Sequence, residues 1–196
     1  MKSVSVFCGS SMGNQESFKE EAKKMANYFC TKGIELTYGG SSVGIMSILA
    51  DTMLANGGRV VGVIPQFLID IEVGHTNLSK LHVVDTMQDR KVLLAKISDA
   101  FIAFPGGMGT LDELFEMITM TQLRIQDKPI GILNIDGYYD HLLLFLDRAV
   151  TDGFVRKEHR DNIMVSDNIE DLMGQMSAFE PVKMTHWIND IKDESA

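Results

Sequence analysis

Basic residues are scarce in this sequence. Eighteen lysines and arginines stand against 27 aspartates and glutamates, which gives a formal net charge of −9. Nucleic-acid polymers and anionic membranes bind to basic protein surfaces, so the sequence disfavours both as partners. A small phosphorylated ligand is still allowed, because it needs only a local positive potential.

Cysteines and long apolar runs are also rare. The two cysteines, Cys8 and Cys30, lie in apolar surroundings, which favours buried free thiols over a disulfide and predicts a cytoplasmic location. No stretch approaches the roughly 18 apolar residues of a membrane helix, and the apolar run in "MKSVSVFC" is too short for a signal peptide. No internal repeat or linker is apparent, so we expect one domain over residues 1–180 and a polar tail over 181–196.

Patterns of strand and helix alternate along the chain. Strands are predicted over 3–8, 34–38, 59–65, 81–86, 99–105 and 130–136, with a last short one over 162–167. Helices are predicted over 15–32, 44–56, 87–98, 110–123 and 138–153, and a small one from about 170, with a loop or short helix over 66–80. This alternation predicts an α/β protein with a three-layer, doubly wound, Rossmann-like fold, in which helices cover both faces of a mostly parallel sheet.

Loops rich in glycine and hydroxyl residues follow three of the predicted strands. They read "GSSMG", "GGSSVG" and "PGGMGT". Parallel strands place these loops at one edge of the sheet, where glycine-rich turns and helix N-termini bind phosphate through backbone N–H groups. Three converging loops therefore indicate a phosphorylated ligand. The candidate binding residues are Gly9, Ser10, Gly39, Gly40, Gly44, Gly106, Gly107, Met108, Gly109 and Thr110.

Two common nucleotide-binding motifs are missing. A dinucleotide fold needs G-x-G-x-x-G in the first turn and an acidic residue at the end of the second strand, but this sequence reads "CGSSMG" and "TYGG" there. It also contains no G-x-x-x-x-G-K-[ST] motif. The sequence therefore argues against a dinucleotide-dependent dehydrogenase and against a P-loop nucleotidase.

The acidic residues after the third loop allow two interpretations. Thr110 and Glu113 are spaced as T-x-x-E, which is typical of a capping box, and spacing alone favours that explanation. Alternatively, Glu113 lies one helical turn beyond the phosphate loop and could act on a bound sugar. Asp112 is expected to be a solvated acid in the first turn of the helix.

Several short motifs between residues 7 and 140 together resemble one family. "FCGSS", "YGG", "VIP", "MQDRK", "DAFIAFPGGMGTLDE" and "LNIDGYYD" occur in order. The chain resembles the LONELY GUY family, which are phosphoribohydrolases acting on cytokinin riboside 5′-monophosphates, and its members have often been labelled lysine decarboxylases. The most specific elements are P-G-G-x-G-T-x-x-E at 105–113 and M-x-x-R-K at 87–91.

The resemblance implies a reaction and a set of residues. The reaction is hydrolysis of an N-glycosidic bond, releasing a free base and ribose 5-phosphate, with no metal or other cofactor, in a homodimer whose active sites lie near the interface. By resemblance, Arg90 and Glu113 are the catalytic pair. Glu72, Lys91 and Thr119 match positions that contact the nucleotide, and Leu111 and Asp112, which follow the phosphate loop, are further candidate binding residues. A carboxylate suits this chemistry, because positive charge develops at the anomeric carbon when such a bond breaks.

The stretch "TMTQLRIQ" leaves the preferred base open. Members from plants commonly read T-W-x-Q-L-G-I-H there, whereas this chain has Met120, Arg124 and Gln126 in place of tryptophan, glycine and histidine. Adenosine monophosphate or another purine nucleotide therefore stays as plausible a substrate as a cytokinin nucleotide. The alternative function is a nucleotide-binding protein without turnover, similar to a molybdenum-cofactor carrier, which has no use for the Arg90–Glu113 pair.

Overall fold

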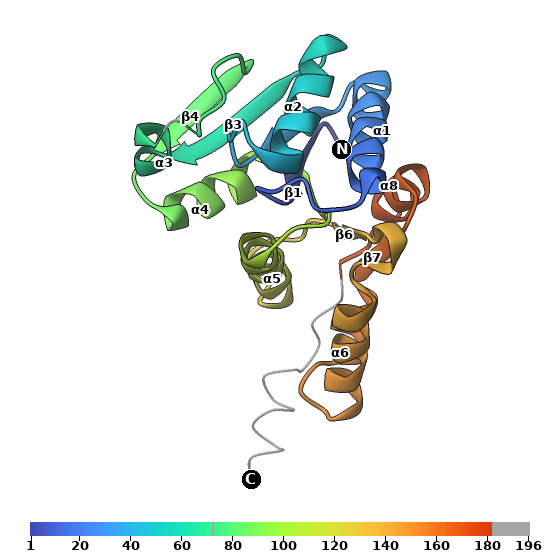
Figure 1. The fold of residues 1–196 in the computed structure, drawn as a ribbon. Helices are drawn as coiled ribbons and strands as arrows, with labels where there is room; N and C mark the ends of the chain where they lie inside the picture. Colours follow the sequence, from blue (N-terminus) through green and yellow to red (C-terminus); the bar gives the residue numbers. More distant parts are fainter. Residues whose placement is uncertain (72, 182–196) are drawn as a thin grey trace.

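A computed structural model describes residues 1–71 and 73–181 of the chain. Within these residues, one seven-stranded parallel sheet has the order β4-β3-β2-β1-β5-β6-β7 (Figure 1). The strands are β1 (Ser3–Phe7), β2 (Glu35–Tyr38), β3 (Val60–Pro65), β4 (Lys80–Val84), β5 (Ala100–Ala103), β6 (Ile130–Leu133) and β7 (Ile163–Ser166). The strand order reverses between β1 and β5, which defines a doubly wound sheet. The predicted fold class is confirmed.

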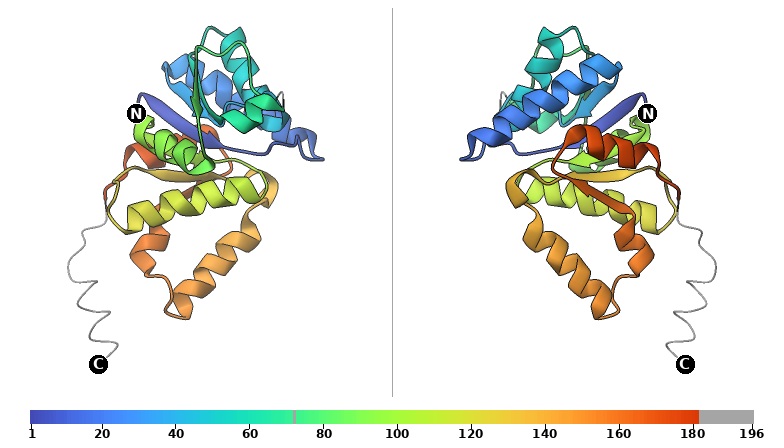
Figure 2. Two further views of the ribbon diagram at one scale, coloured as in Figure 1. Left: turned by 90° about the vertical axis from the view of Figure 1, so that its left-hand side faces the viewer. Right: turned by 90° about the vertical axis from the view of Figure 1, so that its right-hand side faces the viewer.

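Helices cover both faces of this sheet. They are α1 (Glu16–Lys32), α2 (Gly44–Ala55), α3 (Gln66–Asp70), α4 (Met87–Ile97), α5 (Met108–Gln122), α6 (Asp140–Thr151), α7 (Lys157–Asp161) and α8 (Ile169–Ser177), with a 3-10 turn η1 (Ile135–Gly137) before α6. Residues of α1, α2 and α8 form one core cluster, and residues of α4, α5 and α6 form a second. Figure 2 shows α1 and α2 on one side of the sheet and α5 and α6 on the other.

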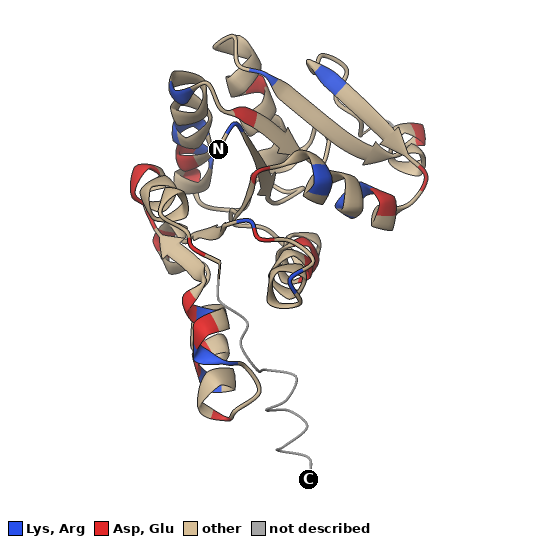
Figure 3. Cartoon of the chain, turned by 180° about the vertical axis from the view of Figure 1, so that it is seen from behind, with Lys and Arg blue, Asp and Glu red and all other residues tan. Residues whose placement is uncertain are grey.

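Burial explains why the inner strands are nearly continuous apolar runs. Every residue of β1, β3, β5 and β6 is buried, because helices pack on both faces of a parallel sheet. Helices α1, α4 and α6 carry charged residues of both signs, whereas α5 and α8 carry acidic ones alone (Figure 3). No helix in the described part of the chain is long and apolar enough to cross a membrane.

The structure differs from the predicted elements at a few places. Helix α5 begins at Met108, two residues earlier than the pattern indicated, and β6 ends at Leu133, where the turn η1 takes over. The short helix α7 was not predicted, because five residues carry too little periodicity to detect. The predicted polar tail lies, from residue 182 onward, outside the described residues.

The three glycine-rich loops meet at the carboxyl edge of the sheet, as predicted. The N–H of Gly9, after β1, donates to the carbonyl of Pro105, after β5, at 3.1 Å. The N–H of Ile45, at the start of α2, donates to the carbonyl of Gly9 at 3.1 Å. These bonds join the three loops at the point where the strand order reverses, which is where ligands bind in such sheets.

Candidate active site

A cavity of about 380 Å³ opens where these loops meet. Its polar part is lined by Arg90, Glu113, Thr110 and the backbone of Gly107–Gly109, and Ser10 and Gly39 also reach it. Its apolar part includes Val43, Met46, Leu68 and Met108. The volume is within the range typical of small-ligand sites. The loop following β2 was expected near the site, but the apolar residues of this loop and of the segment following β3 carried no sequence signal that marked them as lining the cavity.

The N-terminus of α5 presents free N–H groups to this cavity. Gly107 is the N-cap, and no side chain caps the helix. No described residue accepts a hydrogen bond from the N–H groups of residues 107–110. Unpaired N–H groups at the positive end of the helix dipole form a ready site for an anion such as phosphate.

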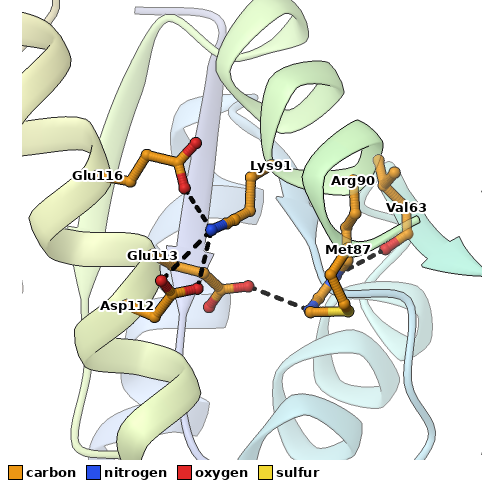
Figure 4. A network of polar contacts seen from close by, with 7 residues as sticks. All are labelled: Val63, Met87, Arg90, Lys91, Asp112, Glu113 and Glu116. Carbon is orange, nitrogen blue, oxygen red and sulfur yellow. Dashed lines mark hydrogen bonds and ion pairs between the residues drawn. The ribbon is translucent and has the colours of Figure 1, made fainter.

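The capping box that the T-x-x-E spacing of Thr110 and Glu113 allows does not form, which leaves the alternative interpretation of Glu113 as a site residue. Because Gly107 lets the helix begin at Met108, Thr110 is already the third helical residue and cannot act as the N-cap. The side chain of Glu113 is directed instead toward α4, where it lies beside Arg90 (Figure 4).

Arg90 and Glu113 form a buried ion pair. Nη1 of Arg90 lies 3.2 Å from Oε1 of Glu113, and the two residues are only 9% and 6% exposed. Nε of Arg90 donates to the carbonyl of Val63 at 3.1 Å, so β3 orients the guanidinium. Oε1 of Glu113 has no well-aligned hydrogen bond within the described residues, so charge alone holds it toward Arg90. This carboxylate therefore keeps lone pairs for a ligand or a water molecule.

The surroundings of Glu113 make it a weaker acid. Burial raises the pKa of Glu113 above its ordinary value, Arg90 opposes this rise, and Asp112 adds to it. A buried carboxyl group whose pKa is shifted upward and that faces a cavity is a good candidate for proton transfer or for stabilising charge. Burial also raises the pKa of the nearby Cys8 thiol, which therefore stays protonated and is no nucleophile at neutral pH.

Local structure in α4 sets the position of Arg90. Oγ1 of Thr86 accepts from the N–H of Asp89 at 3.0 Å, and the Asp89 carboxylate accepts from the N–H of Thr86 at 3.2 Å. This capping box starts α4 one turn before Arg90. Gly39 gives the guanidinium room, because a Cβ at that position would overlap Nη2 of Arg90.

Lys91 forms a second set of ion pairs next to the first. Its amine lies 3.0 Å from Asp112 and 2.5 Å from Glu116, both on α5 (Figure 4). Burial by itself lowers the pKa of Lys91, but the two carboxylates outweigh it and raise that pKa. Lys91 therefore stays charged and links α4 to α5. Asp112 is exposed, as expected, but it is paired rather than only solvated.

The remaining predicted residues are divided between the cavity and other places. Leu111, Asp112 and Thr119 line a groove on the outer face of α5, not the cavity. Gly40, Gly44 and Gly106 belong to the loops that form the cavity but do not line it. Glu72 lies outside the described residues. Gly9 joins two loops through its hydrogen bonds, and it lines a second hollow with Tyr138.

The fold and the cavity together define a class of protein. It is a Rossmann-like protein in which the free N–H groups at a helix N-terminus lie beside a buried carboxylate. A family described as possible lysine decarboxylase matches residues 46–176. The chain is 42% identical over 181 residues to a cytokinin riboside 5′-monophosphate phosphoribohydrolase of Arabidopsis thaliana, covering 92% of this chain and 79% of that protein. It is 44% identical over 178 residues to a probable enzyme of the same name from rice, Oryza sativa subsp. japonica, covering 91% and 72%. The chain belongs to this phosphoribohydrolase family, as the LONELY GUY resemblance implied.

Solved structures confirm the fold at lower identity. A molybdenum cofactor binding protein from the phototrophic bacterium Rippkaea orientalis has a TM-score of 0.68 at 18% identity, covering 90% of this chain and 95% of that one. The molybdenum cofactor carrier protein of Chlamydomonas reinhardtii has a TM-score of 0.64 at 19% identity, covering 90% and 98%. At such identities the likeness concerns the fold alone.

Proposed function

We propose that this protein hydrolyses the N-glycosidic bond of a purine-type riboside 5′-monophosphate, derived from adenosine or a cytokinin. Water adds to the anomeric carbon while the bond to the base breaks. The bonding electron pair leaves with the base, which gains a proton, and the products are free base and ribose 5-phosphate. The observation that carries the proposal is the buried Arg90–Glu113 pair beside the free N–H groups of α5.

The N-terminus of α5 holds the 5′-phosphate in this proposal. The N–H groups of residues 107–110 supply hydrogen bonds and the helix dipole supplies positive potential, which compensates locally for the net charge of −9. With the phosphate fixed there, the ribose lies toward Glu113, one turn further along the same helix. The apolar part of the cavity, with Met46, Leu68 and Met108, then accommodates the base.

Glu113 and Arg90 act on the sugar in this proposal. The ionised carboxylate stabilises the positive charge that develops on the ribose and accepts a proton from the attacking water. Arg90 orients Glu113, favours its ionised form and can donate to ribose or phosphate oxygens. A protein that only carries a nucleotide needs no buried carboxylate at this place, so the pair favours an enzyme.

A panel of nucleosides and nucleoside monophosphates tests the proposal. Chromatography should detect free base from adenosine monophosphate or a cytokinin riboside monophosphate, and far less from the matching nucleosides. The best base in the panel defines the specificity. Equal cleavage of adenosine and its monophosphate would rule out the phosphate site, and tight binding without any released base would identify a carrier.

We also propose that the protein is a cytoplasmic homodimer. Free thiols at Cys8 and Cys30 suit a reducing compartment. The apolar run Val92, Leu93 and Leu94 in α4 gives little support for an interface on that helix, because Leu94 is fully buried and Leu93 packs against the core. The groove on α5 is a better candidate interface. It is lined by Phe115, Thr119, Met120, Leu123 and Ile125, and a second copy could cover it.

A further inference from the structure

Two adjacent tyrosines donate hydrogen bonds to the loop that precedes α5. The hydroxyl of Tyr138 donates to the carbonyl of Gly106 at 2.7 Å, and the hydroxyl of Tyr139 donates to the carbonyl of Phe104 at 2.8 Å. The carbonyl between them, on Pro105, accepts from the N–H of Gly9. All three consecutive carbonyls before the helix are therefore held, while the N–H groups that follow them are free.

The turn that carries the tyrosines is itself held in an uncommon conformation. Asp136 has a φ of 52°, unusual for a residue other than glycine, and its carboxylate accepts from the hydroxyl of Ser17 at 2.5 Å. The N–H of Tyr139 donates to the side chain of Asn134 at 2.7 Å. The bond from Ser17 to Asp136 and the bond from Tyr139 to Asn134 hold the turn in place, and so they fix the direction in which the side chains of Tyr138 and Tyr139 point.

The two tyrosines differ in their surroundings. Tyr139 is buried in the core, so its hydroxyl also stabilises the fold. Tyr138 is 46% exposed and packs edge-on against Phe18 and Tyr139, with ring centroids 5.7 Å and 4.9 Å away. It lies with Gly106 in a hollow of its own, which adjoins the cavity at Ser10 and Gly107.

The bond from Tyr138 determines where one free N–H points. A trans peptide is planar, so the carbonyl of Gly106 and the N–H of Gly107 point in opposite directions. A hydroxyl that holds this carbonyl therefore directs the N–H of Gly107 away from Tyr138, and Gly107 lies where the hollow meets the cavity. Glycine is the residue least able to hold such a plane by itself, and Gly106 and Gly107 are adjacent.

We propose that Tyr138 is a positioning residue that orients the Gly106–Gly107 peptide toward the substrate phosphate. The inference rests on the proposed function, because it assumes that a phosphate binds at the N-terminus of α5. Tyr138 touches no reacting atom. It acts on the affinity for the phosphate group, which is bound equally before and during the reaction, and so it affects KM more than kcat.

The test compares Tyr138→Phe with the wild-type protein and with Tyr28→Phe. The control removes a hydroxyl from a half-buried tyrosine on α1, remote from the loop. For Tyr138→Phe we expect KM for adenosine monophosphate to rise roughly three- to tenfold, as for loss of one hydrogen bond, with kcat within about twofold. The dissociation constant of ribose 5-phosphate, measured by calorimetry, should rise by the same factor. Tyr28→Phe should change neither constant.

The binding measurement separates this inference from the proposed function. A wild-type protein that binds ribose 5-phosphate but releases no base contradicts the proposed function alone. Equal affinities of wild type and Tyr138→Phe for ribose 5-phosphate, at equal melting temperatures, contradict the positioning role alone. The positioning role would also be overturned if Tyr138→Phe lowered kcat and weakened the binding of unphosphorylated adenosine as much as it weakened the binding of ribose 5-phosphate. That pattern would indicate a general loosening of the fold.

Discussion

Glu113 is placed where its charge is both costly and useful. Burial disfavours the ionised carboxylate, and Arg90, 3.2 Å away, favours it. The proposed reaction needs the ionised form next to the sugar. A residue selected only for stability would avoid this arrangement, because an apolar or neutral side chain would pack there without a desolvation penalty.

Glu113→Gln is expected to separate activity from stability. The substitution keeps the shape of the side chain and removes its charge, so kcat should fall by ~10²–10⁴-fold while the phosphate-binding N–H groups remain. The pKa of Glu113 is raised in the folded protein, so the folded protein keeps a proton that the unfolded chain releases. The free energy of unfolding therefore falls as pH rises from the ordinary glutamate pKa through the raised pKa. Loss of this desolvation cost favours the variant at neutral pH, whereas Arg90 loses its countercharge, so we expect only a small change in melting temperature.

Scanning calorimetry and turnover at saturating substrate measure the two effects. Glu20→Gln, on the exposed surface of α1, is the matched control and should leave both unchanged. Near-wild-type turnover in Glu113→Gln would exclude a catalytic carboxylate at this position.

The activity of the wild-type protein should also depend on the neighbours of Glu113. The acid limb of the kcat profile is expected above the pH typical of an ordinary glutamate, because the ionised form is required and its pKa is raised. Glu116 contributes to that rise and also pairs with Lys91. Glu116→Gln should move the acid limb to lower pH, measured as kcat across a buffer series. A shift to higher pH would contradict the assignment of this limb to Glu113.

At the scale of elements, α4 and α5 act as two rigid supports for the site. Helix α5 supplies the N-terminus and Glu113, while α4 supplies Arg90 and, through Lys91, the link between the two helices. Small shifts of either helix would separate the ion pair. Groups held on helices keep such geometry better than groups held on loops.

Removing the cap of α4 should affect activity as well as stability. Thr86→Ala abolishes the capping box and is expected to cost about 1 kcal/mol in the free energy of unfolding. The side chain of Asn168 caps α8 by accepting from the N–H groups of Glu170 and Asp171. Asn168→Ala removes this cap and should lower the free energy of unfolding by a similar amount. Of these two helices, α4 carries a site residue and α8 does not, so only Thr86→Ala should also lower kcat/KM. Denaturant titrations and steady-state kinetics on both variants test this, and equal kinetics would show that the first turn of α4 does not position Arg90.

At the scale of the whole molecule, the groove on the outer face of α5 is bordered by apolar side chains that the single chain leaves exposed. Ile125 is 65% exposed and Leu123 is 46% exposed, and both border the groove that also contains Thr119 and Asp112. A second copy on this face would bury these apolar side chains and bring its own chain close to the paired residues Lys91 and Asp112.

Ile125→Glu is therefore expected to weaken the proposed dimer. Light scattering should give twice the 21.8 kDa chain mass for the wild type and a shift toward the single-chain mass for the variant. Val92→Glu, at an exposed position of α4, is the matched control. If Val92→Glu dissociates the dimer and Ile125→Glu does not, the interface lies on α4 instead, and a monomeric wild type would refute the dimer itself.

Much of the architecture is determined by local patterns in the sequence. The order of strands and helices follows from runs such as "AFIA" and from the apolar spacing of Phe18, Ala22, Met25 and Phe29, because burial of one face or two imposes these periods. The meeting of three glycine-rich loops follows from the parallel order of the strands. The motifs around Arg90 and Glu113 indicated the family and the residues on which the proposed chemistry depends.

Only the tertiary structure decided how these residues relate to one another. The T-x-x-E spacing of Thr110 and Glu113 is the same in a cap and in a site, and the start of α5 at Met108 and the presence of Arg90 across the cavity distinguish the two. The groove position of Thr119, and the hydrogen bond from Tyr138 to the loop, likewise depend on segments remote in the chain. Local sequence determines the apolar period of each helix or strand and the positions of the turns. The direction of a side chain toward a distant partner depends on how the whole chain packs.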